Sequence, residues 1–178
     1  MNQSVSTRLG KVLLRPASPS DVDSFRELRL EALKNHPTAF GSDYEESATH
    51  PKEHWLERLN YNDEKEALFF AEYQGQLIGM TGIYRSLSRK VRHSATIWGV
   101  YVKPDWRGRH IAEKLIQSCL NWAIRQNVFI VKLAVVADNK SAIQCYERCG
   151  FAKYGIEPKA ICYENKYYDE ILMACSLN

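Results

Sequence analysis

The stretch that decides the fold is residues 100–112, which read VYVKPDWRGRHIA. Its first residues belong to a predicted strand over about 94–103, which Pro104 ends. Behind the turn, apolar residues recur at helical spacing and predict a helix over 108–125 with one apolar stripe. The chain is therefore expected to run strand, basic turn, helix through this stretch.

The turn itself has the features of an anion site. A helix N-terminus presents unpaired backbone N–H groups and the positive end of the helix dipole, and phosphate binds well there. Arg107 and Arg109 add positive charge, and Gly108 permits close backbone approach. Neither the P-loop nor the Rossmann glycine pattern is present. A phosphate site and a basic surface turn that caps a helix both remain open interpretations.

Upstream of residue 94 we predict three strands and two helices. The strands cover residues 11–15, 67–71 and 77–84, and a glycine turn joins the last two as a hairpin. The first helix runs from about Ser18 to Asn35, because Ser18 can cap it and Pro19 suits the first helical position. A second helix is predicted over 52–60, and residues 36–50 are interpreted as a loop.

Downstream of the first stretch, residues 128–136 are almost continuously apolar and β-branched, which favours a central strand covered on both faces. A helix over Asn139–Cys149 follows, and Gly150 stops it. Residues 151–175 are interpreted as two strands joined by a tight turn at Glu164-Asn165. This order predicts an α/β fold with helices packed on a mixed sheet. The length of 178 residues predicts one domain over residues 1–178.

Composition and charge narrow the classes of partner. The chain is 45% hydrophobic and 25% charged, as in an ordinary soluble globular protein. No run of 18 apolar residues predicts a membrane span, and no signal-peptide pattern is present. The 24 Lys and Arg against 21 Asp and Glu leave a net charge of +3, too small to indicate nucleic acid. We expect no nucleic-acid partner and no membrane partner.

The cysteines are interpreted as free thiols. Their number, five, is odd, and no Cys-x-x-Cys pair occurs, which argues against a disulfide framework and a zinc ribbon. Cys145 and Cys149 share a helix face, but no second pair completes a four-coordinate metal site. We therefore expect no metal and a cytoplasmic location, where thiols stay reduced.

Two motifs resemble those of a known family. Arg107-x-x-His110-x-Ala112, placed after a Val-x-Pro strand end, resembles the Arg/Gln-x-x-Gly-x-Gly/Ala signature of the GNAT superfamily of acetyl-CoA-dependent N-acetyltransferases. Residues 139–151 resemble the Asn-x-x-Ala-x-x-x-Tyr-x-x-x-Gly-Phe helix of the same family. The resemblance implies one GNAT-like domain with a central, mostly antiparallel sheet of six or seven strands and helices on both faces.

His110 departs from the signature, because it stands at the position of the first glycine. If residue 110 has helical dihedrals, a side chain is tolerable and the N–H still points at phosphate. If the position needs positive φ, the affinity for the cofactor suffers.

The resemblance also implies an enzyme that moves an acetyl group from acetyl-CoA to a primary amine of a small molecule or amino-acid-like acceptor. In the family, the strands here over 94–103 and 128–136 splay apart, and the pantetheine arm pairs with the first. The N–H of Val100 is then placed to polarise the thioester carbonyl. The implied cofactor residues are Val100, Val102, Arg107, Gly108, Arg109, His110, Ile111, Ala112, Asn139 and Tyr146.

The resemblance makes Tyr146 the proton donor to the departing thiolate, and a phenol is a competent donor. Packing of its ring against the sheet is the alternative. Asn139 is expected to cap its helix, and the resemblance also places it at the cofactor. The general base stays open, because strand 94–103 carries no carboxylate. The candidates are a water chain, His93, or a carboxylate of the final strands: Glu157, Asp169 or Glu170.

The acceptor is not named by the sequence. The family places acceptor-binding loops at residues 36–44, which makes Phe40 and Tyr44 candidates by location. Trp98, Tyr101 and Trp106 are interpreted as core aromatics. Two other functions remain open, acetylation of a protein N-terminus or lysine and a non-catalytic acyl-CoA-binding module. The final strands could also supply the edge of a homodimer.

Overall fold

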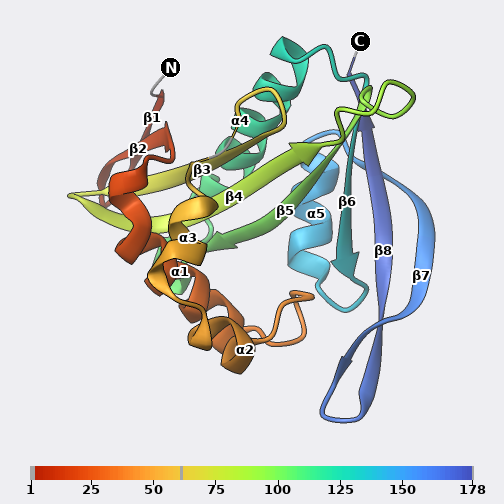
Figure 1. Cartoon of the computed structure of the whole chain (residues 1–178), viewed down its shortest axis with the longest axis horizontal. Helices are drawn as coiled ribbons and strands as arrows, with labels where there is room; N and C mark the ends of the chain where they lie inside the picture. The colour runs from red at the N-terminus through yellow and green to blue at the C-terminus, as the bar shows by residue number, and fades with distance from the viewer. Residues whose placement is uncertain (1–2, 61, 178) are drawn as a thin grey trace.

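An eight-stranded mixed sheet forms the centre of the molecule, in the order β1-β2-β3-β4-β5-β6-β8-β7 (Figure 1). The computed structural model describes residues 3–60 and 62–177, so the predicted domain bounds at residues 1 and 178 lie outside it. The strands are β1 (Gln3–Thr7), β2 (Gly10–Pro16), β3 (Glu66–Tyr73), β4 (Gln76–Arg85), β5 (Ser94–Val102), β6 (Ile130–Val136), β7 (Ala152–Tyr163) and β8 (Lys166–Ser176). Neighbours are antiparallel except β5 and β6, which are parallel.

The predicted mixed, mostly antiparallel sheet is confirmed, with eight strands where six or seven were expected. The additional strand is β1, which pairs with β2 across a turn at Gly10. Gly10 has φ +128, a conformation that glycine adopts easily. The short, polar sequence of β1 lacks the apolar run that indicates a strand, so only its pairing with β2 reveals it.

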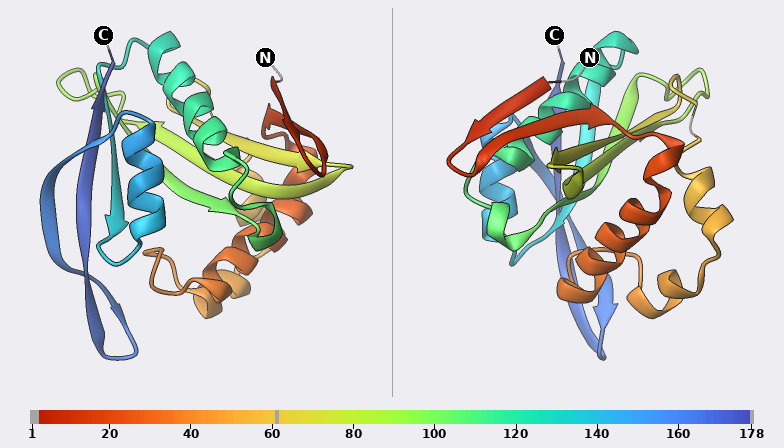
Figure 2. Two further views of the ribbon diagram at one scale, coloured as in Figure 1. Left: turned by 180° about the vertical axis from the view of Figure 1, so that it is seen from behind. Right: turned by 90° about the vertical axis from the view of Figure 1, so that its left-hand side faces the viewer.

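Helices cover both faces of the sheet (Figure 2). The helices α1 (Val22–Asn35), α2 (Tyr44–Thr49) and α3 (Lys52–Glu57) lie on one face, and α4 (Ile111–Arg125) and α5 (Lys140–Arg148) lie on the other. The loop predicted over 36–50 therefore contains one short helix, α2. Asp43 caps it by accepting a hydrogen bond from the N–H of Glu46 at 2.9 Å.

Strand β3 contributes side chains to the hydrophobic clusters on both faces of the sheet. Its side chains alternate, so Leu68 and Phe70 pack in the cluster with α1 and α3, while Ala67, Phe69 and Ala71 pack in the cluster with α4 and α5. Strand β3 is therefore buried on both faces, and β4 and β5 follow it in the sheet.

The pairing of β5 and β6 is short, and this shapes the site. The two strands pair only from Ser94 with Ile130 to Thr96 with Lys132, and beyond this point they diverge (Figure 1). On its other side β5 carries a bulge, because the register with β4 passes from Trp98 directly to Tyr101. Gly99 within the bulge has φ +64. The bulge and the early end of pairing leave the second half of β5 with one open edge.

Trp122 of α4 gives a test of the core. It is fully buried, and its indole Nε1 donates a hydrogen bond to the carbonyl of Asp63 at 3.0 Å. We expect Trp122→Ala to lower the free energy of unfolding by about 3–5 kcal/mol, measured by chemical denaturation. Ile124→Ala on the exposed side of the same helix is the control, with an effect of about 0.5 kcal/mol or less. Equal effects of the two substitutions would contradict this packing.

Candidate active site

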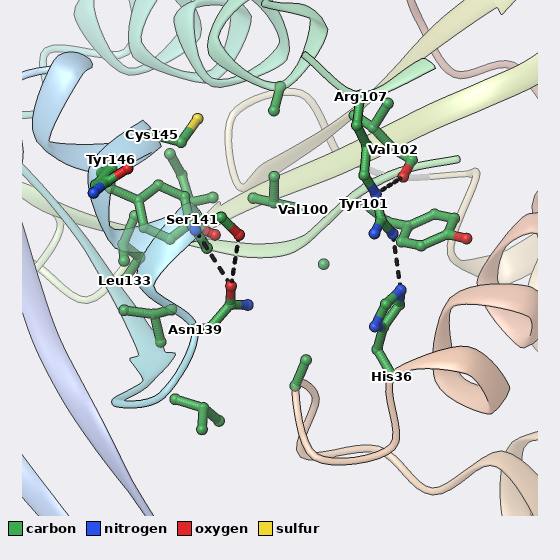
Figure 3. A pocket seen from close by; sticks show the side chains of 18 of the residues that line it. His36, Val100, Tyr101, Val102, Arg107, Leu133, Asn139, Ser141, Cys145 and Tyr146 are labelled. Atoms are coloured by element: carbon green, nitrogen blue, oxygen red, sulfur yellow. Dashed lines mark hydrogen bonds between the residues drawn. The ribbon is translucent and has the colours of Figure 1, made fainter. Parts of the chain in front are cut away.

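The divergence of β5 and β6 opens a cavity of about 680 Å³. It is lined mainly by β5, β6, the turn before α4 with the first residues of that helix, α5 and the segment 36–40. Figure 3 shows Asn139 and Tyr146 on one side of the cavity, Arg107 and His36 on the other, and Val100 between them. Residues from distant parts of the sequence therefore meet where the two strands separate.

Almost every cofactor residue named from the sequence lines this cavity: Val100, Val102, Arg107, Gly108, His110, Ile111, Ala112, Asn139 and Tyr146. Arg109 does not. Its side chain is turned toward the backbone of its own turn, where Nη2 lies 3.4 Å from the carbonyl oxygen of Asp105. Of the two arginines in the turn, only Arg107 thus reaches the cavity wall.

The turn before α4 contains two residues in the left-handed region. Gly108 has φ +71, and His110, the N-cap of α4, has φ +59 and ψ 16. Residue 110 therefore has positive φ and not helical dihedrals, and a side chain stands at this position, while the effect on cofactor affinity stays a prediction. The imidazole is directed at Glu113, whose Oε2 lies 2.8 Å from His110 Nδ1.

Glu113 links the turn to α5. Its Oε1 accepts a hydrogen bond from Arg148 Nε at 2.7 Å while Oε2 contacts His110. Burial opposes the ionised carboxyl, but the hydrogen bonds from Arg148 and His110 outweigh it and hold the pKa of Glu113 below its usual value. The carboxylate therefore stays charged and fixes the start of α4 against the end of α5.

Substitution of His110 separates the role of its backbone from that of its imidazole. We expect His110→Gly to keep the Kd for acetyl-CoA within about threefold, because glycine adopts the same positive φ without strain. His110→Val, a β-branched residue at positive φ, should lower the free energy of unfolding by about 1–2 kcal/mol. Calorimetric titration and denaturation measure these effects. A tenfold weaker Kd in the glycine variant would mean that the imidazole itself contacts the cofactor.

Arg107 is held on the side of the cavity near segment 36–40. Its Nε donates to the carbonyl oxygen of Val102 at 2.9 Å, and its Nη2 lies 2.8 Å from His36 Nε2. Burial, together with the charge of Arg107, lowers the pKa of His36. His36 is therefore neutral at neutral pH, and its Nε2 accepts from the guanidinium. The sequence indicated His36 only as the first residue of a candidate loop.

Tyr146 lies on α5 with its side chain 8% exposed, and its ring packs edge-on against Phe151 at 6.2 Å. Burial raises the pKa of the phenol above its ordinary value, and the neighbouring Cys145 and Cys149 add to the effect. The phenol is therefore protonated throughout the neutral range. Tyr146 packs in the core, as the alternative interpretation predicts, and it also lines the cavity, while its role as proton donor stays a prediction.

Asn139 is confirmed as the N-cap of α5, where its Oδ1 accepts from the N–H of Ala142 at 3.3 Å. The candidates for a general base lie elsewhere. His93 is exposed at the beginning of β5, and Glu157 and Glu170 face each other across β7 and β8. Asp169 accepts from the N–H of Lys159 at 2.8 Å. These four residues are not among those that line the cavity.

The aromatic candidates differ in whether they line the cavity. Phe40 lines the cavity, whereas Tyr44 lies on α2 with its ring 5.7 Å from Lys34 Nζ. Trp98 and Tyr101 pack in the core as expected and line the cavity as well. The hydroxyl of Tyr101 donates to Glu31 at 2.8 Å, which ties β5 to α1.

Within residues 3–60 and 62–177, no group of three or more His, Cys, Asp or Glu is arranged to hold a metal ion. None of the helices in the described part of the chain is long and apolar enough to cross a membrane.

The fold and the cavity together define an acetyltransferase architecture, and comparison with family models agrees. The model of the acetyltransferase (GNAT) family matches residues 26–151, so the chain belongs to this family. The family uses acetyl-CoA as its acetyl donor. The resemblance inferred from the two motifs is thereby confirmed.

Several known proteins are similar to this chain. An uncharacterised N-acetyltransferase of Methanocaldococcus jannaschii is 28% identical over 140 residues, 78% of this chain and 59% of the relative. The match thus spans less than two thirds of that relative. A Bacillus subtilis protein assigned as a ribosomal-protein alanine N-acetyltransferase is 24% identical over 94% of this chain and 97% of its own. A Salmonella typhimurium structure assigned as an acetyltransferase, solved with its cofactor acetyl-CoA, has a TM-score of 0.82 at 19% identity and covers 94% of each chain.

Proposed function

We propose that this protein transfers the acetyl group of acetyl-CoA to a primary amine of a small-molecule or amino-acid-like acceptor. The observation that carries the proposal is the divergence of β5 from β6 beyond Thr96. It leaves an open strand edge at Val100 and Val102 between the start of α4 and segment 36–40. One end of the cavity is thus suited to an anionic donor, and the other is free for an acceptor.

The residues on the donor side fit acetyl-CoA. The open edge of β5 offers backbone groups of Val100 and Val102 to an extended amide-containing arm. The start of α4, a helix of 15 residues, directs its free N–H groups and dipole toward the turn at residues 107–112. We infer that the pyrophosphate binds this turn through backbone N–H groups, because Arg109 is turned away from the cavity.

Acetyl-CoA supplies the acetyl group as an activated thioester, and the acceptor amine must be neutral to attack it. The backbone N–H of Val100 would donate to the thioester carbonyl oxygen as negative charge develops there. As the C–N bond forms and the C–S bond breaks, Tyr146 would protonate the departing sulfur, whose thiol has a pKa of roughly 8.5. The amine nitrogen would lose its proton to water, and the phenol would regain one from solvent. Burial keeps the pKa of this phenol raised, so the proton to be donated is present at neutral pH.

A second candidate function is acetylation of a protein α-amine, which the Bacillus subtilis relative favours by its assignment. One experiment compares the two. The protein is incubated with acetyl-CoA and either a panel of small amines or a panel of short peptides with free N-termini, and thiol release is followed. We expect turnover with small amines. Turnover confined to peptides would favour the second function, and acetyl-CoA binding without turnover of either panel would favour a non-catalytic module.

A further inference from the structure

Arg29 is a buried cation that has no carboxylate partner among the residues that the structure describes. It lies on α1 with 5% of its surface exposed, and its Nη2 donates to the hydroxyl of Ser42 at 3.2 Å. Its Nη1 is buried without any hydrogen-bond partner. Within the described part of the chain, no carboxylate forms a salt bridge with it. A buried charge is unfavourable unless it is paired, so this arrangement calls for a functional reason.

The surroundings of Arg29 are aromatic and positively charged. Its guanidinium lies 4.8 Å from the ring of Phe40 and 5.9 Å from that of Trp98. Arg58 lies over the same Trp98 ring at 5.0 Å. Burial and the charge of Arg58 lower the pKa of Arg29 to about 10, which still leaves it charged at neutral pH. Two cations therefore gather around one cavity-lining tryptophan.

The free nitrogen of Arg29 is directed at the bulge of β5. A Cβ atom built on Gly99 would lie 3.6 Å from Nη1, so the guanidinium lies immediately behind this glycine. Gly99, Trp98 and Phe40 all line the cavity. Arg29 itself is not among the residues that line the cavity, so an acceptor group would reach the guanidinium past Gly99, which carries no side chain. The neighbouring residue in sequence is Val100, whose N–H we place at the thioester carbonyl.

We propose that Arg29 binds a carboxylate of the acceptor, so that the substrate is a small molecule with a carboxylate a few bonds from its nucleophilic amine. A guanidinium matches a carboxylate with paired, charge-assisted hydrogen bonds. An acceptor anchored at Arg29 would hold its amine close to the residue that follows Gly99. This inference rests on the proposed function, and it selects one acceptor class. A protein N-terminus has an amide where this acceptor has a carboxylate, so it would leave Arg29 unpaired.

The test compares acceptors that differ only in the carboxylate. L-Amino acids are assayed beside their methyl esters and amides, with kcat/KM from thiol release. Binding is measured in parallel by calorimetry on protein saturated with CoA, where no acetyl transfer can occur. We expect the preferred amino acid to exceed its ester at least about 100-fold in kcat/KM, because a site built for a polar group rejects the analogue that lacks it. Equal values for acid and ester would overturn the proposal without any variant.

Substitutions of Arg29 test whether this residue causes the preference for the acid over its ester. Arg29→Met should abolish the preference for the acid over its ester and leave the Kd for acetyl-CoA unchanged, and Arg29→Lys should retain part of the preference. Arg26→Met is the matched control on the same helix, because the guanidinium of Arg26 donates to the carbonyl of Ala48, whereas that of Arg29 lies beside Gly99. Full preference in Arg29→Met would overturn the proposal.

Failure of the proposed function is recognised separately. If no amine is acetylated but CoA-loaded protein still binds acids in preference to esters, the transfer activity is refuted and the Arg29 site stands. If selective binding is also absent, both are refuted. If amines without a carboxylate are acetylated as efficiently as amino acids, the Arg29 site alone is refuted.

Discussion

Tyr146→Phe is expected to lower kcat about 100-fold while the Kd for acetyl-CoA changes by less than about threefold. The reason is that the substitution removes one proton donor, and a positioned general acid contributes roughly 10²–10⁴-fold to a rate. The ring itself, which packs against Phe151, is retained, so the cavity wall keeps its shape. Steady-state turnover and calorimetric titration with acetyl-CoA measure the two quantities.

Tyr154→Phe is the control for this experiment, because Tyr154 is 56% exposed on β7 and does not line the cavity. It should leave kcat unchanged. Unaltered turnover in Tyr146→Phe would remove the assignment of the phenol as the acid. A parallel loss of acetyl-CoA affinity and kcat would instead make Tyr146 a binding residue.

The pH dependence of the wild-type rate checks the same assignment. Burial raises the pKa of Tyr146 above its ordinary value of 10.0, so the phenol keeps its proton as the pH rises to that value. The donor is the protonated form, and we therefore expect no fall in kcat from its ionisation below about pH 10. An alkaline loss of kcat near pH 8 that disappears in Tyr146→Phe would contradict the raised pKa.

The elements around the cavity were predictable because local signals define them. The helix expected over 139–149 is found at Lys140–Arg148, since Asn139 caps its start and Gly150, with φ +91, ends it. The turn at Glu164-Asn165 also follows expectation, with both residues at positive φ. Caps and tight turns depend on a few neighbouring residues, so a single sequence contains the information.

Residues whose roles depend on long-range packing could not be predicted. His36 meets Arg107 across 71 positions of sequence, and no spacing rule connects them. Arg29 has the pattern of an ordinary helical arginine, and only the packed structure shows that its charge is buried beside Gly99. The left-handed backbone of His110 was likewise one of two open possibilities. Local interactions therefore determine the parts of the site at α4 and α5. Long-range packing determines the parts at α1 and the β5 bulge.

Removal of the backbone N–H of Val100 is expected to lower kcat by about 10²–10³-fold, the usual loss when one donor to a developing oxyanion is deleted. A side-chain substitution cannot test this donor, so the Val100 amide is replaced by an ester, with the α-hydroxy analogue of valine at that position. The side chain remains. The register between β4 and β5 passes over Gly99 and Val100, and β6 pairs with β5 only as far as Thr96. Val100 thus has no paired residue in either neighbouring strand, and we expect the free energy of unfolding to change little.

The same amide-to-ester replacement at Leu87 is the control, because Leu87 is 49% exposed in the segment between β4 and β5. It should leave kcat and the Kd for acetyl-CoA unchanged. At Val100, the Kd should rise far less than kcat falls, since charge develops on the carbonyl oxygen mainly as the amine attacks. A loss confined to Kd would mean that this N–H holds the bound donor and does not stabilise the reacting carbonyl. An ester variant within threefold of wild type in kcat would show that the oxyanion is stabilised elsewhere in the cavity.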